Sequence, residues 1–429
     1  MSGRIAVIGG GWAGLACAVE LSAAGRQVCV FEAARQLGGR ARRVEIHGFP
    51  LDNGQHILLG AYHETLRLMR MAGADPDTRL ERLPLELNHP GGGFRLRLPR
   101  LPAPLHLALG LMRMQGASLR EKLSAARFMR ALQCARYRLP EDISVANLLD
   151  RHGQTGALRR FMWEPLCLAA LNTPPATASA QIFANVLRDS LGGQREDTDL
   201  LLPATDLGQL LPDAARRFIE SAGGEVRLST RIDTLQASLI IGGETYAHVV
   251  IAAAPQHASA LLRSFPETAD IAGLLDGYAF EPIGTVYLGY PKALSLPFPM
   301  LGLDKPEAGR IGQWSFDRSD KKSGQGIAAC VLSGEGLWDT LDNETLAATL
   351  HRELQDTLDR PLPAPLWHQV IRERRATFSC RPGLARPTPE TPVRNLWLAG
   401  DYVCADYPAT LEGAVRSGVA VARRILAQS

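Results

Sequence analysis

The sequence contains no apolar run long enough to cross a membrane and no recognisable secretion signal. No stretch reaches the roughly 18–20 uncharged apolar residues that a transmembrane helix needs. The N-terminus runs from Met1 almost directly into residues 5–8, an apolar stretch typical of a buried strand rather than of a leader peptide. These absences predict a cytoplasmic protein, and they leave open a peripheral attachment to the cytoplasmic face of a membrane.

Disulfide and metal-binding patterns are absent as well. The seven cysteines are scattered, odd in number and form no CxxC pair, which fits a reducing compartment and argues against a zinc site; no metal site is predicted. A net charge of +3 over 429 residues is too small to indicate nucleic-acid binding. With 46% hydrophobic and 21% charged residues, the composition is that of a globular protein of two or three domains.

A glycine-rich turn opens the chain. Residues 4–8 predict a short buried strand and residues 13–24 a helix, and between them Gly9, Gly11 and Gly14 fill the positions of a GxGxxG motif. Such glycines allow a tight turn, the close approach of a pyrophosphate and tight packing of the helix on the strand. The N-terminus of this helix would face the phosphates.

A second strand and an acid complete the unit. Residues 28–31 predict a strand that ends at Glu32, 18 residues after Gly14, where an acid can accept both ribose hydroxyls. The complete βαβ pattern therefore predicts a dinucleotide site. Glu32 disfavours NADP at this site because its carboxylate would repel a 2′-phosphate.

Two further segments favour FAD over NAD. The glycine pair at Gly38 and Gly39 lets the backbone fold over the pyrophosphate, and the next residue, Arg40, can neutralise it. Near the other end of the chain, residues 396–401 predict a strand that ends in Gly-Asp, and residues 410–414 open a helix. A strand that leads to a helix N-terminus is a second anion-binding arrangement. No cysteine lies in an obvious attachment motif, so we expect non-covalent FAD.

These patterns predict an α/β fold, with a Rossmann-like FAD-binding domain that is discontinuous in the chain. We assign to it residues 1–80, 200–260 and 385–429. The intervening residues 81–199, which look helical, and 261–384, which look strand-rich, would form an inserted α+β substrate-binding domain. Strands are predicted in the FAD-binding domain at residues 224–232 and 249–255. In the second insert they are predicted at residues 282–288, 312–316 and 326–331.

One segment of the first insert is strongly basic. Residues 95–138 contain ten basic side chains and a single acid, Glu121, so the segment carries +9 whereas the whole chain carries +3. Large apolar residues are interleaved with the basic ones. The pattern is typical of helices that lie on a membrane surface, but also of a helix pair with a solvated basic face. Nucleic acid fits poorly because aromatic residues are few here.

Several stretches resemble a superfamily of flavin enzymes. Residues 49–57 are similar to the stretch that leads from the pyrophosphate to the isoalloxazine ring in the amine oxidase superfamily. Residues 399–402 and 408–418 resemble plant-type phytoene desaturases. A closer resemblance, carried by residues 163–175 and 313–318, is to the squalene-associated, desaturase-like flavoproteins of bacterial hopanoid synthesis, the hydroxysqualene dehydroxylases.

The resemblance covers nearly the whole chain and, with the motifs above, implies a set of FAD contacts. In the superfamily, the Gly-Asp acid holds the ribityl chain or pyrophosphate, and the C-terminal helix aims N–H groups at the flavin. The backbone near Ile232 would contact the adenine. The predicted cofactor-binding residues are Gly9, Gly11, Trp12, Ala13, Gly14, Glu32, Ala33, Gly39, Arg40, Ala41, Gly54, Gln55, His56, Ile232, Gly400, Asp401, Leu411, Glu412 and Ala414.

The resemblance also implies a reaction: reduced FAD gives a hydride to hydroxysqualene, and squalene and water form. An allylic hydroxyl leaves readily once protonated, and a dry apolar tunnel would keep water away from the allyl cation. The proton donor stays open among His56, whose pKa suits the task, Glu164, if it is buried, and Tyr407. The electron donor for FAD is not indicated.

Three alternatives remain at this stage. A carotenoid or phytoene-type desaturase would run hydride transfer in the opposite direction with the same fold and cofactor. Flavin amine oxidases commonly keep a lysine in a substrate-domain strand, whereas none of the five lysines of this chain falls in a predicted strand. A non-catalytic flavin-bound scaffold for a membrane enzyme complex is the third.

Overall fold

The computed structural model describes residues 3–236, 238–303, 310–319 and 324–428. The chain begins with β1 (Ile5–Ile8), α1 (Trp12–Ala23) and β2 (Val28–Phe31). All residues of both strands are buried, as expected for apolar strands of a parallel sheet covered on both faces. The predicted βαβ unit is confirmed, and Gly25 after the helix has a left-handed φ of 74°.

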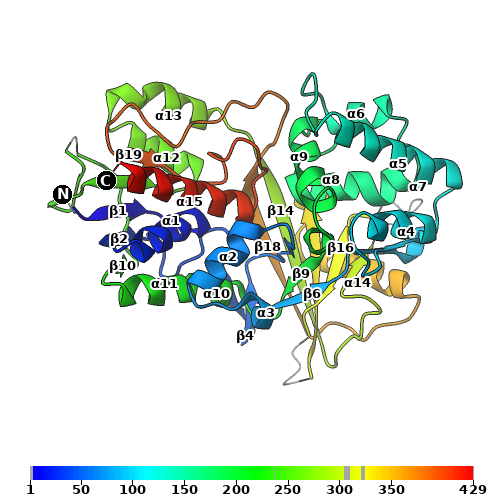
Figure 1. Ribbon diagram of the computed structural model, residues 1–429. Helices are drawn as coiled ribbons and strands as arrows, with labels where there is room; N and C mark the ends of the chain where they lie inside the picture. Colours follow the sequence, from blue (N-terminus) through cyan, green and yellow to red (C-terminus); the bar gives the residue numbers. More distant parts are fainter. Residues whose placement is uncertain (1–2, 237, 304–309, 320–323, 429) are drawn as a thin grey trace.

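This unit forms the centre of a five-stranded parallel sheet in the order β10-β2-β1-β13-β19. Strands distant in sequence complete it, namely β10 (Glu225–Arg227), β13 (His248–Ile251) and β19 (Leu396–Leu398). The long C-terminal helix α15 (Leu411–Ala427) packs on α1, so both chain ends lie on this side of the molecule (Figure 1). The sheet and its helices form the predicted Rossmann-like domain.

A second five-stranded sheet is separate from the parallel sheet. Its five antiparallel strands have the order β15-β16-β17-β14-β18. One face buries an apolar cluster against α14 (Asn343–Leu358). The strands are β14 (Phe280–Tyr290), β15 (Met300–Gly302), β16 (Trp314–Asp317), β17 (Gly326–Ser333) and β18 (Trp367–Phe378).

The expectation that residues 81–199 are helical is wrong for the first part of this segment. Alternating apolar residues form a hairpin of β7 (Glu86–His89) and β8 (Phe94–Arg97), in which Phe94 and Leu96 point into the core. Helices follow and occupy the right of Figure 1. They are α4 (Leu105–Arg113), α5 (Leu119–Cys134), α6 (Val145–Arg151), α7 (Gly156–Leu158), α8 (Glu164–Leu171) and α9 (Ala180–Leu191).

Smaller elements connect the two halves. β3 (Arg43–Ile46) and β4 (Phe49–Asp52) form a hairpin, and a three-stranded sheet has the order β5-β9-β6. The remaining elements are β5 (Leu58–Leu59), β6 (Leu80–Leu83), β9 (Leu200–Pro203), β11 (Ile240–Ile241), β12 (Glu244–Thr245), α2 (His63–Met71), α3 (Pro76–Arg79), α10 (Leu207–Leu210), α11 (Pro212–Ser221), α12 (Pro255–Leu262) and α13 (Ala269–Asp276).

Two predicted boundaries differ from the observed elements. The domain boundary at residue 260 cuts α12, and α12 and α13 lie together on the side of the parallel sheet in Figure 1. The strand predicted at residues 224–232 ends at Arg227. Beyond it, the amides of Ser229 and Thr230 bond to Ala34 and Glu32, so the chain follows the loop after β2 instead of the sheet.

Candidate functional site

The turn between β1 and α1 forms a backbone cradle. Gly9 has a φ of 113°, which L side chains rarely adopt, and a Cβ on Gly14 would lie 2.0 Å from the Gly9 carbonyl oxygen. At Gly11, by contrast, the nearest protein atom to an added Cβ is the Gly39 Cα at 3.9 Å. Two of the glycines are therefore required by the fold itself, and the third faces open space of the kind that a pyrophosphate would fill.

Glu32 ends β2 at the edge of this cradle. Its carboxylate accepts hydrogen bonds from the amides of Gly10 and Ala34, both at 2.7 Å. Since an ionised carboxylate offers about four acceptor positions, two lone pairs remain for ribose hydroxyls. Glu32 and Ala33 line the cavity, as does Ile232.

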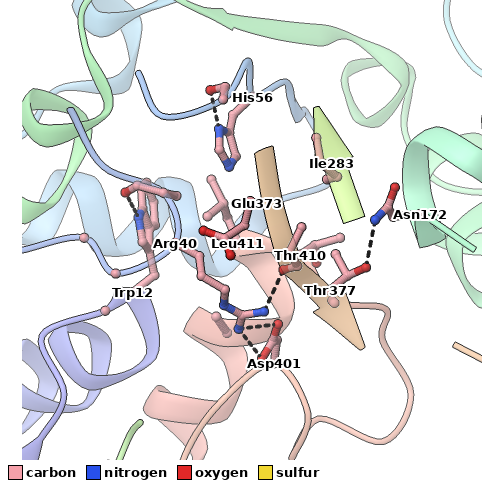
Figure 2. A pocket seen from close by; sticks show the side chains of 18 of the residues that line it. Trp12, Arg40, His56, Asn172, Ile283, Glu373, Thr377, Asp401, Thr410 and Leu411 are labelled. Carbon is pink, nitrogen blue, oxygen red and sulfur yellow. Dashed lines mark hydrogen bonds and ion pairs between the residues drawn. The ribbon is translucent and has the colours of Figure 1, made fainter. Parts of the chain in front are cut away.

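Arg40 and Asp401 meet although 361 residues separate them. One guanidinium nitrogen of Arg40 donates to both carboxylate oxygens of Asp401, at 2.8 and 2.7 Å, and the other donates to the carbonyl of Ala376 in β18 (Figure 2). The sequence predicted both residues at the cofactor but not this ion pair. The pair connects the glycine loop, the Gly-Asp strand end and the second sheet at one point of the cavity wall.

The stretch after β4 brings Gln55 and His56 to the cavity. Figure 2 shows His56 at this position. The Oε1 atom of Gln55 is buried without a hydrogen-bond partner in the described chain, which fits a flavin N–H that would supply one. The Nδ1 atom of His56 lies 2.9 Å from the Gly54 carbonyl oxygen, and burial lowers the pKa of His56. A carbonyl only accepts, so a neutral His56 donates through Nδ1 and presents Nε2 to its surroundings as an acceptor.

The N-terminus of α15 faces the same cavity, which Leu411 and Ala414 line. Thr410 caps the helix by accepting the Gly413 amide at 3.1 Å. The amides of Leu411 and Glu412 precede the first intrahelical bond, so they are available to an electron-rich edge of a ligand.

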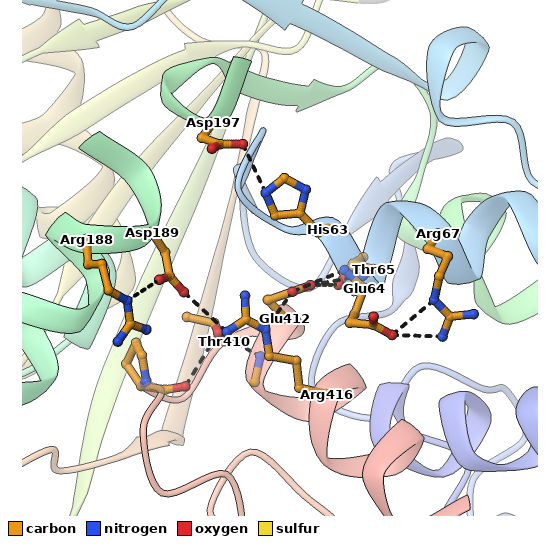
Figure 3. A network of polar contacts seen from close by, with 12 residues as sticks. His63, Glu64, Thr65, Arg67, Arg188, Asp189, Asp197, Thr410, Glu412 and Arg416 are labelled. Carbon is orange, nitrogen blue, oxygen red and sulfur yellow. Dashed lines mark hydrogen bonds and ion pairs between the residues drawn. The ribbon is translucent and has the colours of Figure 1, made fainter. Parts of the chain in front are cut away.

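The side chain of Glu412 has a role other than contact with the cofactor, which its backbone amide alone could provide. Its side chain is fully buried and accepts hydrogen bonds from the Thr65 amide and hydroxyl at 2.9 and 2.7 Å (Figure 3). It also pairs with Arg416 at 2.8 Å, and Arg416 reaches Asp189 of α9 at 3.2 Å. The carboxylate therefore holds the flavin-facing end of α15 against α2 and α9 rather than facing the cavity.

The cradle continues into one cavity of about 1350 Å³. The two blocks that carried the family resemblance supply part of its far wall, through Pro165, Leu166 and Ala169 of α8 and through Trp314 and Phe316 of β16. That wall is mainly apolar. Other apolar residues lining it are Ile57, Leu59, Leu85, Leu87, Met162, Ala170, Val186, Leu191, Leu200, Ile283, Met300 and Val331.

The three candidate proton donors, His56, Glu164 and Tyr407, do not all lie at the cavity. His56 and Tyr407 line the cavity, and burial raises the pKa of Tyr407, which keeps its phenol protonated. Glu164 does not meet the condition of burial on which it was a candidate. Its side chain is 38% exposed, is held by Arg159 at 2.7 Å and does not line the cavity, because α8 turns Pro165 and Leu166 inward instead.

Sequence reasoning did not assign several polar residues of the cavity wall, among them Tyr62, Asn172 and Glu373. Asn172 ends α8 in the left-handed conformation and donates to the Thr377 hydroxyl at 3.0 Å, which fixes the helix to β18 (Figure 2). Tyr62 and Asn172 lie within motifs already recognised, so their position in the motif was the available signal. Glu373 had none, because its cavity position depends on strand register.

The described part of the chain holds no group of three or more His, Cys, Asp or Glu side chains arranged for a metal ion. None of the residues lining the cavity is a cysteine or a lysine within that part. Lys122 bonds instead to the carbonyls of Met112 and Met114, and Lys292 is exposed. The other lysines, Lys305, Lys321 and Lys322, lie outside the described residues.

Comparison with known proteins agrees with this geometry. The family model for flavin-containing amine oxidoreductases matches residues 12–426. The chain belongs to the flavin-containing amine oxidoreductase family. FAD is therefore the cofactor that the cradle, the Arg40–Asp401 pair and the α15 N-terminus accommodate, and the protein is an FAD-dependent oxidoreductase.

Individual known proteins differ in how similar they are to this chain. The hydroxysqualene dehydroxylase of Rhodopseudomonas palustris is 31% identical over all of this chain and 99% of its own length. The zeta-carotene desaturase of a Synechocystis strain is 22% identical, with 99% of this chain and 97% of the desaturase covered. Cyclohexylamine oxidase of Brevibacterium oxydans shares the fold with a TM-score of 0.68 at 19% identity, and 100% of this chain and 99% of the oxidase align.

Proposed function

We propose that the protein is a hydroxysqualene dehydroxylase, which reduces the allylic alcohol to squalene. The observation that carries this proposal is the continuity of the cavity: the flavin-binding cradle opens directly into a chamber with an apolar wall. Full-length similarity to a hydroxysqualene dehydroxylase at 31% identity supports the same substrate class, whereas the zeta-carotene desaturase is less similar at 22%.

The chain's own residues suit an ionising reaction on an apolar substrate. The apolar side chains of α8 and of the second sheet would exclude water from an allyl cation. Reduced FAD supplies the hydride that quenches such a cation. The backbone amides of Leu411 and Glu412 would stabilise negative charge on the nearby ligand edge, because they belong to a helix N-terminus.

Tyr407 is the proton donor we propose. It precedes α15, lines the cavity, and lies with its ring 4.3 Å from the Arg416 guanidinium. A phenol is protonated at neutral pH, so Tyr407 carries a proton for a leaving hydroxyl, although burial raises its pKa and makes it a weaker acid. His56 is less suitable, because a neutral imidazole that donates through Nδ1 has only an acceptor at Nε2.

The substrate class also suggests a place of action. A C30 isoprenoid partitions into a bilayer rather than into water, so we propose that the protein works as a peripheral protein at the membrane surface. Among the described residues, no helix is long and apolar enough to span a membrane.

An anaerobic single-turnover experiment tests the function. The flavin of the purified holoenzyme is photoreduced, and hydroxysqualene is added in detergent. We expect reoxidation of the flavin absorbance together with stoichiometric squalene in the lipid extract. The control is the same reduced enzyme with squalene itself, which should leave the flavin reduced.

Other outcomes would move the assignment. A flavin that stays reduced with hydroxysqualene contradicts the proposal. If the oxidised flavin is then bleached by a polyene, the protein is a desaturase, and if it is bleached by an amine, it is an amine oxidase. A flavin whose absorbance none of these substrates changes would favour a non-catalytic, flavin-bound scaffold protein.

A further inference from the structure

The outer face of α4 and α5 exposes an unusual concentration of large apolar side chains. Seven such side chains are exposed in the described chain, and five of them fall between residues 101 and 123. The concentration matters because isolated exposed leucines are ordinary, whereas grouped ones mark interaction sites. The five are Leu101, Leu105, Met112, Leu119 and Leu123, with Met112 66% and Leu119 73% exposed.

These side chains are not needed to pack the helices on the protein. α5 buries Ala125, Phe128 and Leu132 on its inner face. Leu119 and Leu123, one turn apart, project from a different side of the same helix and remain outside. A helix with a merely solvated basic face does not need this second apolar stripe, so the exposed stripe favours the membrane-surface interpretation.

The end of α4 and the start of α5 form one surface. The ammonium group of Lys122 donates to the carbonyls of Met112 and Met114, at 3.0 and 2.6 Å, and so ties the two helices together. We call the exposed side chains of residues 100–130 on these two helices and on the segment before α4 the α4–α5 face. It lies on the side of the molecule away from the parallel sheet (Figure 1).

The charge of the α4–α5 face is uncompensated. Its exposed arginines form no ion pair with a carboxylate of the described chain; they are Arg100, Arg113, Arg120, Arg127 and Arg130. The one acid of the segment, Glu121, is engaged with the Ser118 amide and hydroxyl and with the Ala157 amide. The face thus combines apolar side chains with unpaired positive charge.

The α4–α5 face also lies close to the apolar part of the cavity. α4 packs on β8, β8 pairs with β7, and Leu87 of β7 lines the cavity. Only one hairpin therefore separates the face from the chamber that would hold the substrate.

We propose that the α4–α5 face docks the protein on a bilayer that contains anionic lipids. The apolar side chains would enter the headgroup region while the arginines contact lipid phosphates, as for interfacial amphipathic helices. The proposal rests on the proposed function for its biological sense, since a C30 isoprenoid is held in bilayers. A second copy of the chain is a poorer occupant, because a two-fold contact would bring identical arginine clusters together.

Vesicle sedimentation with the holoenzyme tests the docking. We expect binding to phosphatidylcholine vesicles that contain phosphatidylglycerol, weak binding without it, and a loss of binding as salt rises. The variant Leu119→Asp with Leu123→Asp should bind at least about ten-fold more weakly. The matched control is Leu337→Asp with Leu366→Asp, since these leucines are 74% and 63% exposed elsewhere on the protein.

The charge is tested separately with Arg127→Glu and, as its control, Arg217→Glu on α11, which is also exposed. Equal losses in the test and control variants, or binding that ignores phosphatidylglycerol, would overturn the proposal. So would a dimer in sedimentation velocity that the Leu119 and Leu123 substitutions dissociate, because the face would then be an interface between copies.

Turnover separates this proposal from the proposed function. In detergent, the face variants should reduce hydroxysqualene at the parental rate, because no residue of the face lines the cavity. Turnover in detergent without vesicle binding overturns the docking proposal alone. Vesicle binding without any turnover contradicts only the dehydroxylase assignment.

Discussion

Two glycines of the same motif should respond oppositely to alanine. Gly11 has φ −77° and ψ 178°, which alanine adopts freely, and an added Cβ meets no protein atom closer than 3.9 Å. At Gly14, an added Cβ would lie 2.0 Å from the Gly9 carbonyl oxygen and 3.1 Å from the Ala252 Cβ. We therefore predict that Gly11→Ala folds normally but binds FAD more weakly, whereas Gly14→Ala damages the fold itself.

The magnitudes follow from what each methyl group meets. In Gly11→Ala the apoprotein loses only the difference between glycine and alanine at a helix N-cap, about 1 kcal/mol or less. The same methyl group would occupy space that the pyrophosphate needs, and overpacking of about 1–3 kcal/mol weakens FAD binding about five- to 150-fold. In Gly14→Ala both opposing atoms belong to a closely packed strand and turn, so we expect about 3 kcal/mol or more of lost stability.

Titration and unfolding measure the two effects separately. FAD is added to each apoprotein while flavin fluorescence is followed, and urea unfolding of the apoprotein gives its stability. Parental FAD affinity in Gly11→Ala would refute the inference that the pyrophosphate crosses this glycine. An unfolded Gly11→Ala apoprotein would refute the inference that the space beside it is free of protein.

The other predictions concern the chemistry and the domain contact. Tyr407→Phe should retain FAD but slow squalene formation in single turnover by about 10²-fold or more, whereas Glu164→Gln, outside the cavity, should leave the rate within about two-fold of the parent. Ala169→Trp should fill the apolar chamber, so that FAD content stays and hydroxysqualene no longer reoxidises the flavin. Burial raises the pKa of Asp52 from 3.8 to about 6. The carboxyl group therefore favours folding below about pH 4, and its contribution of about 3 kcal/mol to the free energy of unfolding is lost as the pH rises through 6. Asp52→Asn should flatten this part of the curve of unfolding free energy against pH, as measured by urea unfolding.

The parts of the site that the sequence predicted are local in the chain. A strand, three glycines, a helix and an acid fit within about thirty residues of a βαβ unit, and their geometry follows from the backbone alone. Gly9, Gly11 and Glu32 therefore lie where the motif places them. The family resemblance implied an apolar tunnel, and the block at residues 163–175 that carried the resemblance supplies part of the apolar wall.

The parts that the sequence did not predict depend on side-chain direction and on tertiary partners. The carboxylate of Glu412, at the start of the flavin-facing helix, is turned to Thr65, 347 residues earlier. The sequence could not say whether Glu164 is buried, and in the structure Arg159, five positions earlier, pairs with it at the surface. Side-chain direction and tertiary partners decide such roles, and neither is written in a local pattern.

Asp52 illustrates how such a distant partner affects function. It immediately precedes the stretch that carries Gln55 and His56, and its carboxylate accepts the Leu207 amide at 2.7 Å and faces Arg318 at 3.3 Å. Arg318 ends the second block that carried the family resemblance, so this block contributes to the apolar wall and also contacts the cofactor-binding segment. Removing Arg318 would leave a buried carboxylate without its cation, a change that typically costs about 3–5 kcal/mol. The contact thus gives the block a structural reason to end in arginine, one that its cavity-lining aromatic residues alone do not supply.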